Sequence, residues 1–138
     1  MTTKIQILVY ILDDNLNDLR QMDRILSNTD TFNIKTFYDP EEFLAAITDD
    51  VYMIITDVSI SDYNVFDTIV NIKKQHPGIY MIVVSGYFDE KILMRLINEC
   101  HIWGIADKNE SRWPENLREI VDLTVPKMLD KKMALANV

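Results

Sequence analysis

Five short apolar runs alternate along the chain with five stretches that have the periodicity of amphipathic helices. The apolar runs are rich in β-branched residues and occupy residues 5–12, 32–37, 52–56, 80–84 and 102–106. The first, third and fourth runs are almost continuously apolar, which is typical of strands that helices cover on both faces. Because parallel strands need a crossover between them, and a helix is the usual crossover, the alternation predicts an α/β domain with a parallel five-stranded sheet.

Capping and helix-breaking residues mark the ends of several predicted helices. Asp39 and Pro40 are expected to start the second helix as its N-cap and its first residue. The His-Pro-Gly sequence at residues 76–78 is expected to end the third helix. Pro126 is expected to kink or stop the fifth helix, because proline lacks an N–H and clashes with the preceding turn. We therefore expect one domain over residues 1–125, with residues 126–138 as a helical tail or the start of a linker.

The charge balance and the cysteine content exclude several classes of protein. The 138 residues include 14 Lys and Arg against 22 Asp and Glu, which gives a net charge of −8. So acidic a domain should repel phosphate backbones and anionic lipid, which argues against nucleic-acid or membrane-surface binding. The longest apolar run, residues 5–12, is too short to span a bilayer, and it is not followed by a signal-peptide cleavage pattern. Since Cys100 has no second cysteine to pair with, we expect a soluble cytoplasmic domain without a disulfide.

Polar side chains follow four of the five predicted strands at the point where each strand ends. Asp13 and Asp14 follow the first strand, Asp57 follows the third, Ser85 the fourth and Lys108 the fifth. In an open parallel sheet, ligand sites form beyond the carboxyl ends of the strands. We therefore expect these side chains to converge at one edge of the sheet.

Three carboxylates at one edge of a sheet require a cation among them. Two like charges about 4 Å apart repel by roughly 4 kcal/mol at an effective dielectric constant of ~20. Hard oxygen ligands with room for water suit Mg²⁺, whereas Zn²⁺ would ask for Cys or His. A metal ion beside Lys108 and Ser85 would form a pocket for a phosphoryl group.

Each of these residues also has an ordinary structural interpretation. The Asp13-Asp14 pair is equally compatible with capping the helix that follows, and Asp57 taken alone is more typical of a turn. The Ser85 hydroxyl and the Lys108 ammonium, taken alone, are typical of solvated loops. Their placement at the ends of different strands favours a functional site. Further charges in the first helix are interpreted as a solvated face, and these are Asp18, Arg20, Asp23 and Arg24.

Four segments around the polar residues resemble one known family. The segments VYILDDN at 9–15, ITD at 55–57, VVSG at 83–86 and ADK at 106–108 are similar to the receiver domain of bacterial two-component response regulators. The resemblance extends over residues 4–125, nearly the whole chain. It implies a flavodoxin-like (βα)5 fold, which is a three-layer sandwich whose parallel sheet has the strand order 2-1-3-4-5.

The resemblance also implies a role for each polar residue. Asp57 would be the phosphoacceptor and would become an aspartyl-phosphate. Ser85 and Lys108 would bind phosphoryl oxygens, and the chain would have no enzymatic activity beyond its own phosphorylation and slow autodephosphorylation. The implied cofactor is Mg²⁺, and its implied ligands are Asp13, Asp14, Asp57 and the backbone carbonyl of Ser59.

The same resemblance implies the partners. The phosphodonor would be a sensor histidine kinase or a phosphotransfer protein. Phosphorylation adds about −1.5 to −2 charge, which would reshape the surface formed by the fourth helix, the fifth strand and the fifth helix. This surface would contact a second copy of the chain in a homodimer, or an output domain attached beyond residue 125. Neither nucleic acid nor a membrane would be bound by this domain.

Three positions depart from the family's pattern. Ile105 stands where an aromatic residue is usual, and Tyr87 and Trp103 are the candidates to replace that residue. Asn109 stands where a cis-proline is common; a cis bond before any other residue costs ~3–4 kcal/mol, so we expect a trans bond or an altered loop. The loop after Asp57 reads VSISDYNVF and lacks the proline and glycine common there.

Three other functions are compatible with parts of the sequence. A degenerate receiver would act as a phosphorylation-independent dimerisation or docking module, yet all five active-site groups are present. A Mg²⁺-dependent hydrolase of similar layout would need an Asp two residues after its catalytic Asp, where this chain has Ser59. A flavin-binding domain would need a Ser-, Thr- or Gly-rich loop after the first strand, where Asp13 and Asp14 would repel a phosphate. The phosphoacceptor receiver is therefore the function that the sequence favours.

Overall fold

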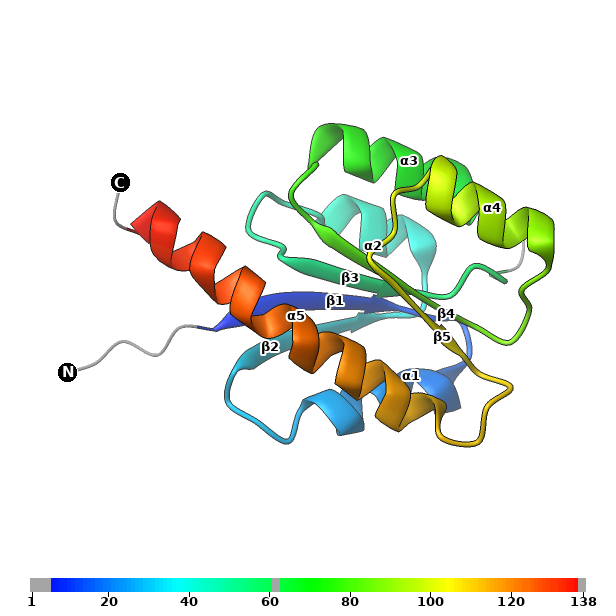
Figure 1. The fold of residues 1–138 in the computed structure, drawn as a ribbon, viewed down its shortest axis with the longest axis horizontal. Helices are drawn as coiled ribbons and strands as arrows, with labels where there is room; N and C mark the ends of the chain where they lie inside the picture. The colour runs from blue at the N-terminus through cyan, green and yellow to red at the C-terminus, as the bar shows by residue number, and fades with distance from the viewer. Residues whose placement is uncertain (1–5, 61–62, 137–138) are drawn as a thin grey trace.

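Five parallel strands form one sheet, and helices pack on both of its faces (Figure 1). The structure, a computed structural model, describes residues 6–60 and 63–136. The strands lie in the order β2-β1-β3-β4-β5 and are β1 (Ile7–Leu12), β2 (Phe32–Phe37), β3 (Met53–Thr56), β4 (Tyr80–Ser85) and β5 (Gly104–Asp107). The helices are α1 (Leu16–Leu26), α2 (Pro40–Ala46), α3 (Val65–Gln75), α4 (Glu90–Asn98) and α5 (Trp113–Ala136). The predicted α/β class, parallel pairing and strand order are confirmed.

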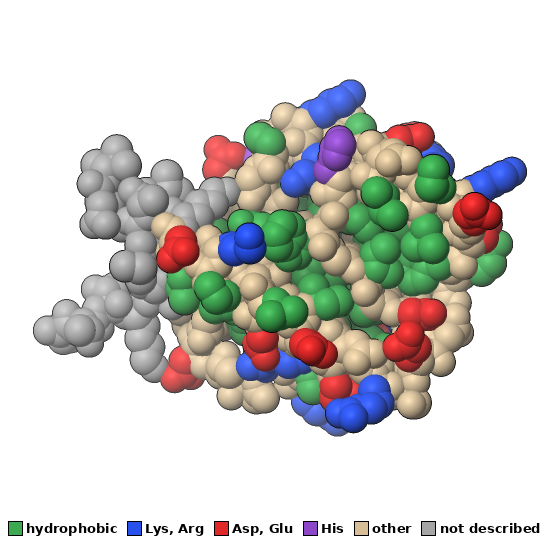
Figure 2. Space-filling view, in the orientation of Figure 1, with side chains coloured by type: hydrophobic (Ala, Val, Ile, Leu, Met, Phe, Trp, Pro, Cys, Tyr) green, Lys and Arg blue, Asp and Glu red, His purple; other side chains and the backbone are tan. Residues whose placement is uncertain are grey.

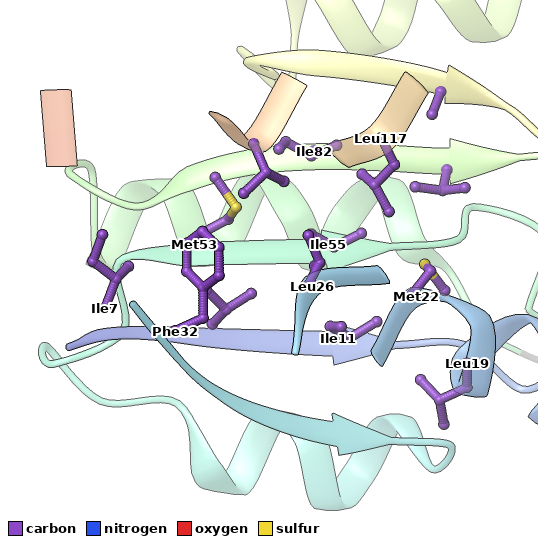
Figure 3. Packing of buried hydrophobic residues seen from close by; sticks show 14 of the residues in the cluster. Ile7, Ile11, Leu19, Met22, Leu26, Phe32, Met53, Ile55, Ile82 and Leu117 are labelled. Atoms are coloured by element: carbon purple, nitrogen blue, oxygen red, sulfur yellow. The ribbon is translucent and has the colours of Figure 1, made fainter. Parts of the chain in front are cut away.

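Two hydrophobic cores lie on opposite faces of the sheet. One core is formed by α1 and α5 against the face that carries Ile7, Ile11 and Ile55, as Figure 3 shows. The other core is formed by α2, α3 and α4 against the face that carries Tyr10 and Ile54. Because successive side chains of a strand point to opposite faces, the nearly continuous apolar runs of β1, β3 and β4 supply both cores. Each fully buried large apolar side chain contributes roughly 1.5–3 kcal/mol to folding.

Side-chain caps start the helices that follow β2, β3 and β4. Asp39 accepts a hydrogen bond from a backbone N–H of the first turn of α2 at 3.1 Å, and Pro40 is the first residue of that helix, as predicted. Asn64 and Asp89 cap α3 and α4 in the same manner. α3 ends directly before His76, where the sequence predicts its end. These caps satisfy backbone N–H groups that a helix start leaves without an intrahelical partner.

The fifth helix continues through Pro126. Pro126 was expected to kink or stop this helix; α5 extends to Ala136, so the helix does not stop there. Proline removes one backbone hydrogen bond, but Met128 lies beyond it and is fully buried in the core formed with α1. This burial offsets the missing hydrogen bond, and the part of the expected tail that the structure describes is helical. Among the described helices, none combines the length and the apolar composition needed to cross a membrane.

The start of β5 is attached to α5 by a hydrogen bond and by close packing. The indole N–H of Trp103 donates to Oγ1 of Thr124 at 2.8 Å, and its ring packs edge-on against Tyr80 with 5.0 Å between centroids. At Gly104 the helix lies so close that an added Cβ would be 2.8 Å from Cγ2 of Ile120. A larger residue at this position would force the Ile120 side chain or the helix to shift, so the close approach of α5 favours glycine here.

We expect Met128→Ala to lower the free energy of unfolding by about 2–5 kcal/mol, because it empties a fully buried position. The matched control is Leu123→Ala on the same helix, where the side chain is 72% exposed and the expected change is below about 0.5 kcal/mol. Urea denaturation followed by circular dichroism measures both changes. Equal losses in the two variants would contradict the packing of α5 beyond Pro126.

Candidate functional site

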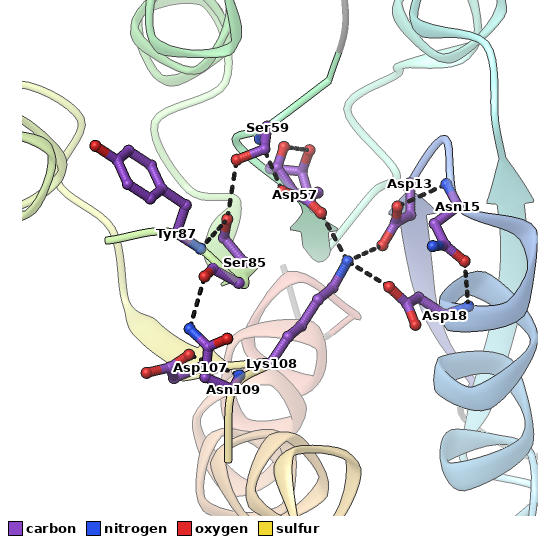
Figure 4. Close-up of polar contacts among 12 residues, drawn as sticks. Asp13, Asn15, Asp18, Asp57, Ser59, Ser85, Tyr87, Asp107, Lys108 and Asn109 are labelled. Carbon is purple, nitrogen blue, oxygen red and sulfur yellow. Dashed lines mark hydrogen bonds and ion pairs between the residues drawn. The ribbon is translucent and has the colours of Figure 1, made fainter. Parts of the chain in front are cut away.

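The carboxyl ends of four strands bring predicted polar residues together (Figure 4). Asp13 comes directly after β1, Asp57 directly after β3 and Lys108 directly after β5, while Ser85 is the last residue of β4. These strands run in the same direction, so their carboxyl ends meet at one edge of the sheet. Asp13, Asp57 and Ser85 are buried there. Burial of the two Asp carboxylates is unusual unless they are paired.

The Lys108 ammonium lies among three carboxylates. Its Nζ atom donates to Oδ2 of Asp57 at 2.6 Å and to Oδ2 of Asp13 at 2.7 Å, and it forms an ion pair with Oδ2 of Asp18 at 2.9 Å. The Lys108 side chain is 12% exposed, while those of Asp13 and Asp57 are 0% and 8% exposed. Water and salt screen such buried pairs much less than surface pairs. Removing one partner from a buried pair typically costs about 3–5 kcal/mol, so these contacts matter to the fold as well as to the site.

Burial and ion pairing shift the pKa values of two groups in the site. Burial raises the pKa of Asp13 above its ordinary value of 3.8, although hydrogen bonds from Lys108 and from the Asn15 N–H act in the opposite direction. Burial acts to lower the pKa of Lys108, but hydrogen bonds to Asp13, Asp57 and Asp18 outweigh it and raise that pKa above its ordinary value of 10.5. Lys108 is therefore a permanent positive charge at neutral pH.

Asp18 belongs to the site, although its place on a charged helix predicted a solvated residue. Asn15 is the N-cap of α1, and its side chain accepts a hydrogen bond from the Asp18 N–H at 3.1 Å. Asp13 accepts instead from the Asn15 N–H at 2.9 Å, so the alternative that the Asp13-Asp14 pair caps this helix is wrong. The signal that could have identified Asp18 is its position in the first turn of the helix that follows β1. That turn starts at the sheet edge where the strands end.

Ser59 and Ser85 connect Asp57 to the end of β4. The Ser59 N–H donates to Oδ1 of Asp57 at 2.7 Å, and the Ser59 hydroxyl lies 3.2 Å from that of Ser85. The Ser85 oxygen also accepts a hydrogen bond from the Tyr87 N–H at 3.3 Å. Ser59 and Lys108 therefore hold the two carboxylate oxygens of Asp57, one each, and fix the plane of the carboxylate.

The loop after β5 is attached to the loop after β4. The Lys108 N–H donates to the Ser85 carbonyl at 2.9 Å, and the Asn109 side-chain Nδ2 donates to the Gly86 carbonyl at 2.6 Å. The described residues contain no cis peptide bond, so the bond before Asn109 is trans as predicted. Asn109 thus provides, with its side chain, a direct link between the loops that carry Ser85 and Lys108.

The aromatic residues near the site differ in exposure and in their hydrogen bonds. Tyr87 is 60% exposed, and its hydroxyl lies 3.3 Å from Oδ2 of Asp89. Trp103 is held by its hydrogen bond to α5. Trp113, which the sequence did not single out, is 8% exposed, and its ring centroid lies 6.0 Å from the Lys108 Nζ atom. Of the two candidates to replace the aromatic residue missing at position 105, Tyr87 is the one whose ring is free of the core.

Asp14 lies outside the group of carboxylates that surrounds Lys108. It is exposed, whereas the ammonium is paired with Asp13, Asp57 and Asp18. Among the residues that the structure describes, no three His, Cys, Asp or Glu side chains are arranged to hold a metal ion. The chemistry of the donor set nevertheless fits Mg²⁺, because carboxylate oxygens are its preferred protein ligands. Three carboxylates against one ammonium also leave an excess of negative charge that a dication would offset.

Comparison with known proteins points to one family. The family model described as "Response regulator receiver domain" matches residues 9–122. The response regulator DrrB from Thermotoga maritima has a TM-score of 0.78 at 21% identity, over 89% of this chain and 54% of that one, so this chain spans about half of its length. A CheY-like receiver domain protein from Methanospirillum hungatei has a TM-score of 0.79 at 19% identity, over 91% and 98% of the two chains. At such identities these likenesses show the fold alone. No curated protein matches the sequence.

The raised pKa of Lys108 predicts a loss of stability at high pH. The pKa of Lys108 is higher in the folded chain than its ordinary value of 10.5, so protonated Lys108 stabilises the fold. This stabilisation is complete below pH 10.5 and is lost as the pH rises through the pKa of the folded chain. We therefore expect the free energy of unfolding to fall more steeply above pH 10.5 in the wild type than in Lys108→Gln, by urea denaturation at a series of pH values.

The matched control for this measurement is Lys91→Gln, which removes an exposed lysine and should keep the wild-type slope. The three proteins contain the same tyrosines, whose ionisation therefore cancels in the comparison. Parallel curves for wild type and Lys108→Gln would contradict the ion pairing of Lys108.

Proposed function

The chain belongs to the response regulator receiver domain family, and from this membership we propose that it accepts a phosphoryl group on Asp57 in two-component signalling. The observation that carries the proposal is the Asp57 carboxylate, which is buried at the sheet edge with Lys108 on one oxygen and the Ser59 N–H on the other. A carboxylate with a fixed plane beside a permanent positive charge is suited to attack an anionic phosphoryl group.

The proposed reaction is a phosphoryl transfer from the phosphohistidine of a sensor histidine kinase or of a phosphotransfer protein. An oxygen of Asp57 forms a bond to phosphorus while the bond between phosphorus and the imidazole nitrogen breaks. The imidazole leaves and takes up a proton, and nothing is oxidised or reduced. Lys108 pairs with one phosphoryl oxygen, and the Ser85 hydroxyl donates to another. We propose no further enzymatic activity beyond slow hydrolysis of the aspartyl-phosphate.

We also propose that the site uses Mg²⁺. The residues that would hold it are Asp13, Asp14, Asp57 and the backbone carbonyl of Ser59. The excess negative charge around Lys108 supports this assignment, as does the position of Asp14 next to Asp13 at the end of β1. When bound, Mg²⁺ supplies positive charge that offsets the charge of the phosphoryl oxygens.

The output of the proposed switch is the surface formed by α4, β5 and α5. Figure 2 shows hydrophobic side chains gathered on the face that these elements present. Met94 and Ile97 on α4 are 54% and 58% exposed, Trp103 before β5 is 45% exposed, and Leu123 on α5 is 72% exposed. The loops that carry Ser85 and Lys108 lead into α4 and α5, so a movement of either residue toward a phosphoryl group would change this surface. An exposed apolar face suits a second copy of the chain in a homodimer or an attached output domain.

We expect incubation with acetyl phosphate and Mg²⁺ to add one phosphoryl group to the wild-type chain, measured by intact mass. The adduct should be absent without Mg²⁺ and absent from Asp57→Asn, which removes the nucleophile at nearly constant size. The matched control is Asp50→Asn, which changes the same charge at an exposed position and should be phosphorylated like the wild type.

Absence of the adduct from the wild type, together with failure of Mg²⁺ and beryllium fluoride to bind, would refute phosphoryl acceptance. The alternative of a phosphorylation-independent docking or dimerisation module would then stand. An adduct that survives in Asp57→Asn would instead place the acceptor on another residue.

A further inference from the structure

We propose that Asp18 is a positioning residue that holds the Lys108 ammonium in the unmodified protein and competes with the phosphoryl group for it. The inference rests on the proposed phosphorylation of Asp57. It assigns a function to a carboxylate on α1. The other residues of the site lie at strand ends, and these are Asp13, Asp57, Ser85 and Lys108.

Three carboxylates surround the ammonium in the structure, two through hydrogen bonds and the third through an ion pair. A lysine ammonium has three donors and no acceptor. The partners of Lys108 are Asp57 at 2.6 Å, Asp13 at 2.7 Å and Asp18 at 2.9 Å, and all three are carboxylates (Figure 4). A phosphoryl oxygen that approaches Lys108 therefore competes for the ammonium with carboxylates that already surround it.

Asp18 is the partner that can be released at the smallest cost. Its side chain is 25% exposed, whereas those of Asp13 and Asp57 are 0% and 8% exposed. A carboxylate with access to water recovers hydration when its ion pair breaks, whereas the fully buried Asp13 would be left as an unpaired charge, and Asp57 is the carboxylate that the proposed reaction modifies. Asp18 also has the longest of the three distances to the ammonium.

The start of α1 keeps Asp18 in this position. The Asn15 side chain accepts the Asp18 N–H at 3.1 Å, and Asn15 itself donates its N–H to Asp13 at 2.9 Å. The cap therefore fixes Asp18 relative to Asp13, which is part of the same ion-pair group. The position of Asp18 depends on the local turn at 13–18 and not on a long flexible segment.

Asp18→Asn should therefore speed the phosphorylation of Asp57. The substitution removes a competitor for Lys108 and one negative charge beside an anionic phosphodonor, while the backbone N–H that Asn15 caps is kept. At saturating Mg²⁺ we expect acetyl phosphate to form the adduct roughly threefold faster, or more, than in the wild type.

The control for charge alone is Asp23→Asn. Asp23 lies on the same helix, and its carboxylate accepts a hydrogen bond from the Ser27 hydroxyl at 2.8 Å. Asp23→Asn changes the net charge by the same amount as Asp18→Asn, but it leaves the three partners of Lys108 in place. Its adduct should form at the wild-type rate.

A second measurement separates pairing with Lys108 from a purely structural effect of the substitution. Asp18→Asn, Lys108→Gln and the double variant form a double-mutant cycle for unfolding in urea. With Lys108 present, Asp18→Asn loses an ion pair; with Gln at position 108, it removes only repulsion from the other carboxylates. Asp18→Asn should therefore lower the urea midpoint less in the Lys108→Gln background than in the wild type, or raise it.

The outcomes distinguish this inference from the function on which it rests. The competition is supported if Asp18→Asn forms the adduct faster than the wild type while Asp23→Asn forms it at the wild-type rate. It also requires a non-zero coupling free energy between Asp18 and Lys108 in the unfolding cycle. Equal rates in Asp18→Asn and wild type, a slower Asp18→Asn, or additive effects in the cycle overturn it and leave phosphorylation of Asp57 intact. A wild-type chain that forms no adduct refutes the proposed function, and the competition with it.

Discussion

The Lys108 ammonium joins carboxylates that come from three separate parts of the chain: Asp13 after β1, Asp18 in α1 and Asp57 after β3. Without this charge, the carboxylates would repel one another in a place where little water can solvate them. The same contacts connect the end of β5 to the centre of the sheet. The edge at which the strands end is thus stabilised by the residue that the proposed chemistry also needs, so stability and function depend on one side chain.

The sequence predicted the parts of the structure that depend on local patterns. The apolar runs determine where β1, β3, β4 and β5 end, and those ends place Asp13, Asp57, Ser85 and Lys108 at one edge. Features that depend on packing between distant segments were not predicted. The position of Asp18 in the first turn of α1 places it at the sheet edge, but its contact with Lys108 also requires the end of β5 to lie beside that turn, which only the tertiary structure shows. The helix continues past Pro126 because Met128 is buried against the sheet, and this tertiary packing outweighs the local signal of the proline.

The substitution of Asn109 for the family's proline has a physical consequence in the loops around the site. With Asn109 in place of proline, the loop after β5 keeps a trans bond and gains a side-chain donor, which binds the carbonyl of Gly86. The loops that carry Ser85 and Lys108 are therefore attached to each other on the outer side of the site. A movement of one loop is transmitted to the other through this hydrogen bond as well as through the backbone contact between Lys108 and Ser85.

The position of Trp113 has an optical consequence. The chain contains two tryptophans. Trp113 is almost completely buried with the Lys108 ammonium near its ring, while Trp103 is partly exposed with Lys127 near its ring. A soluble quencher such as iodide reaches Trp103 far more readily than Trp113, so the emission that resists quenching comes mainly from the indole beside the site. The electric field on that indole changes whenever Lys108 exchanges one partner for another. We therefore expect the emission of Trp113 to depend on which groups Lys108 is paired with.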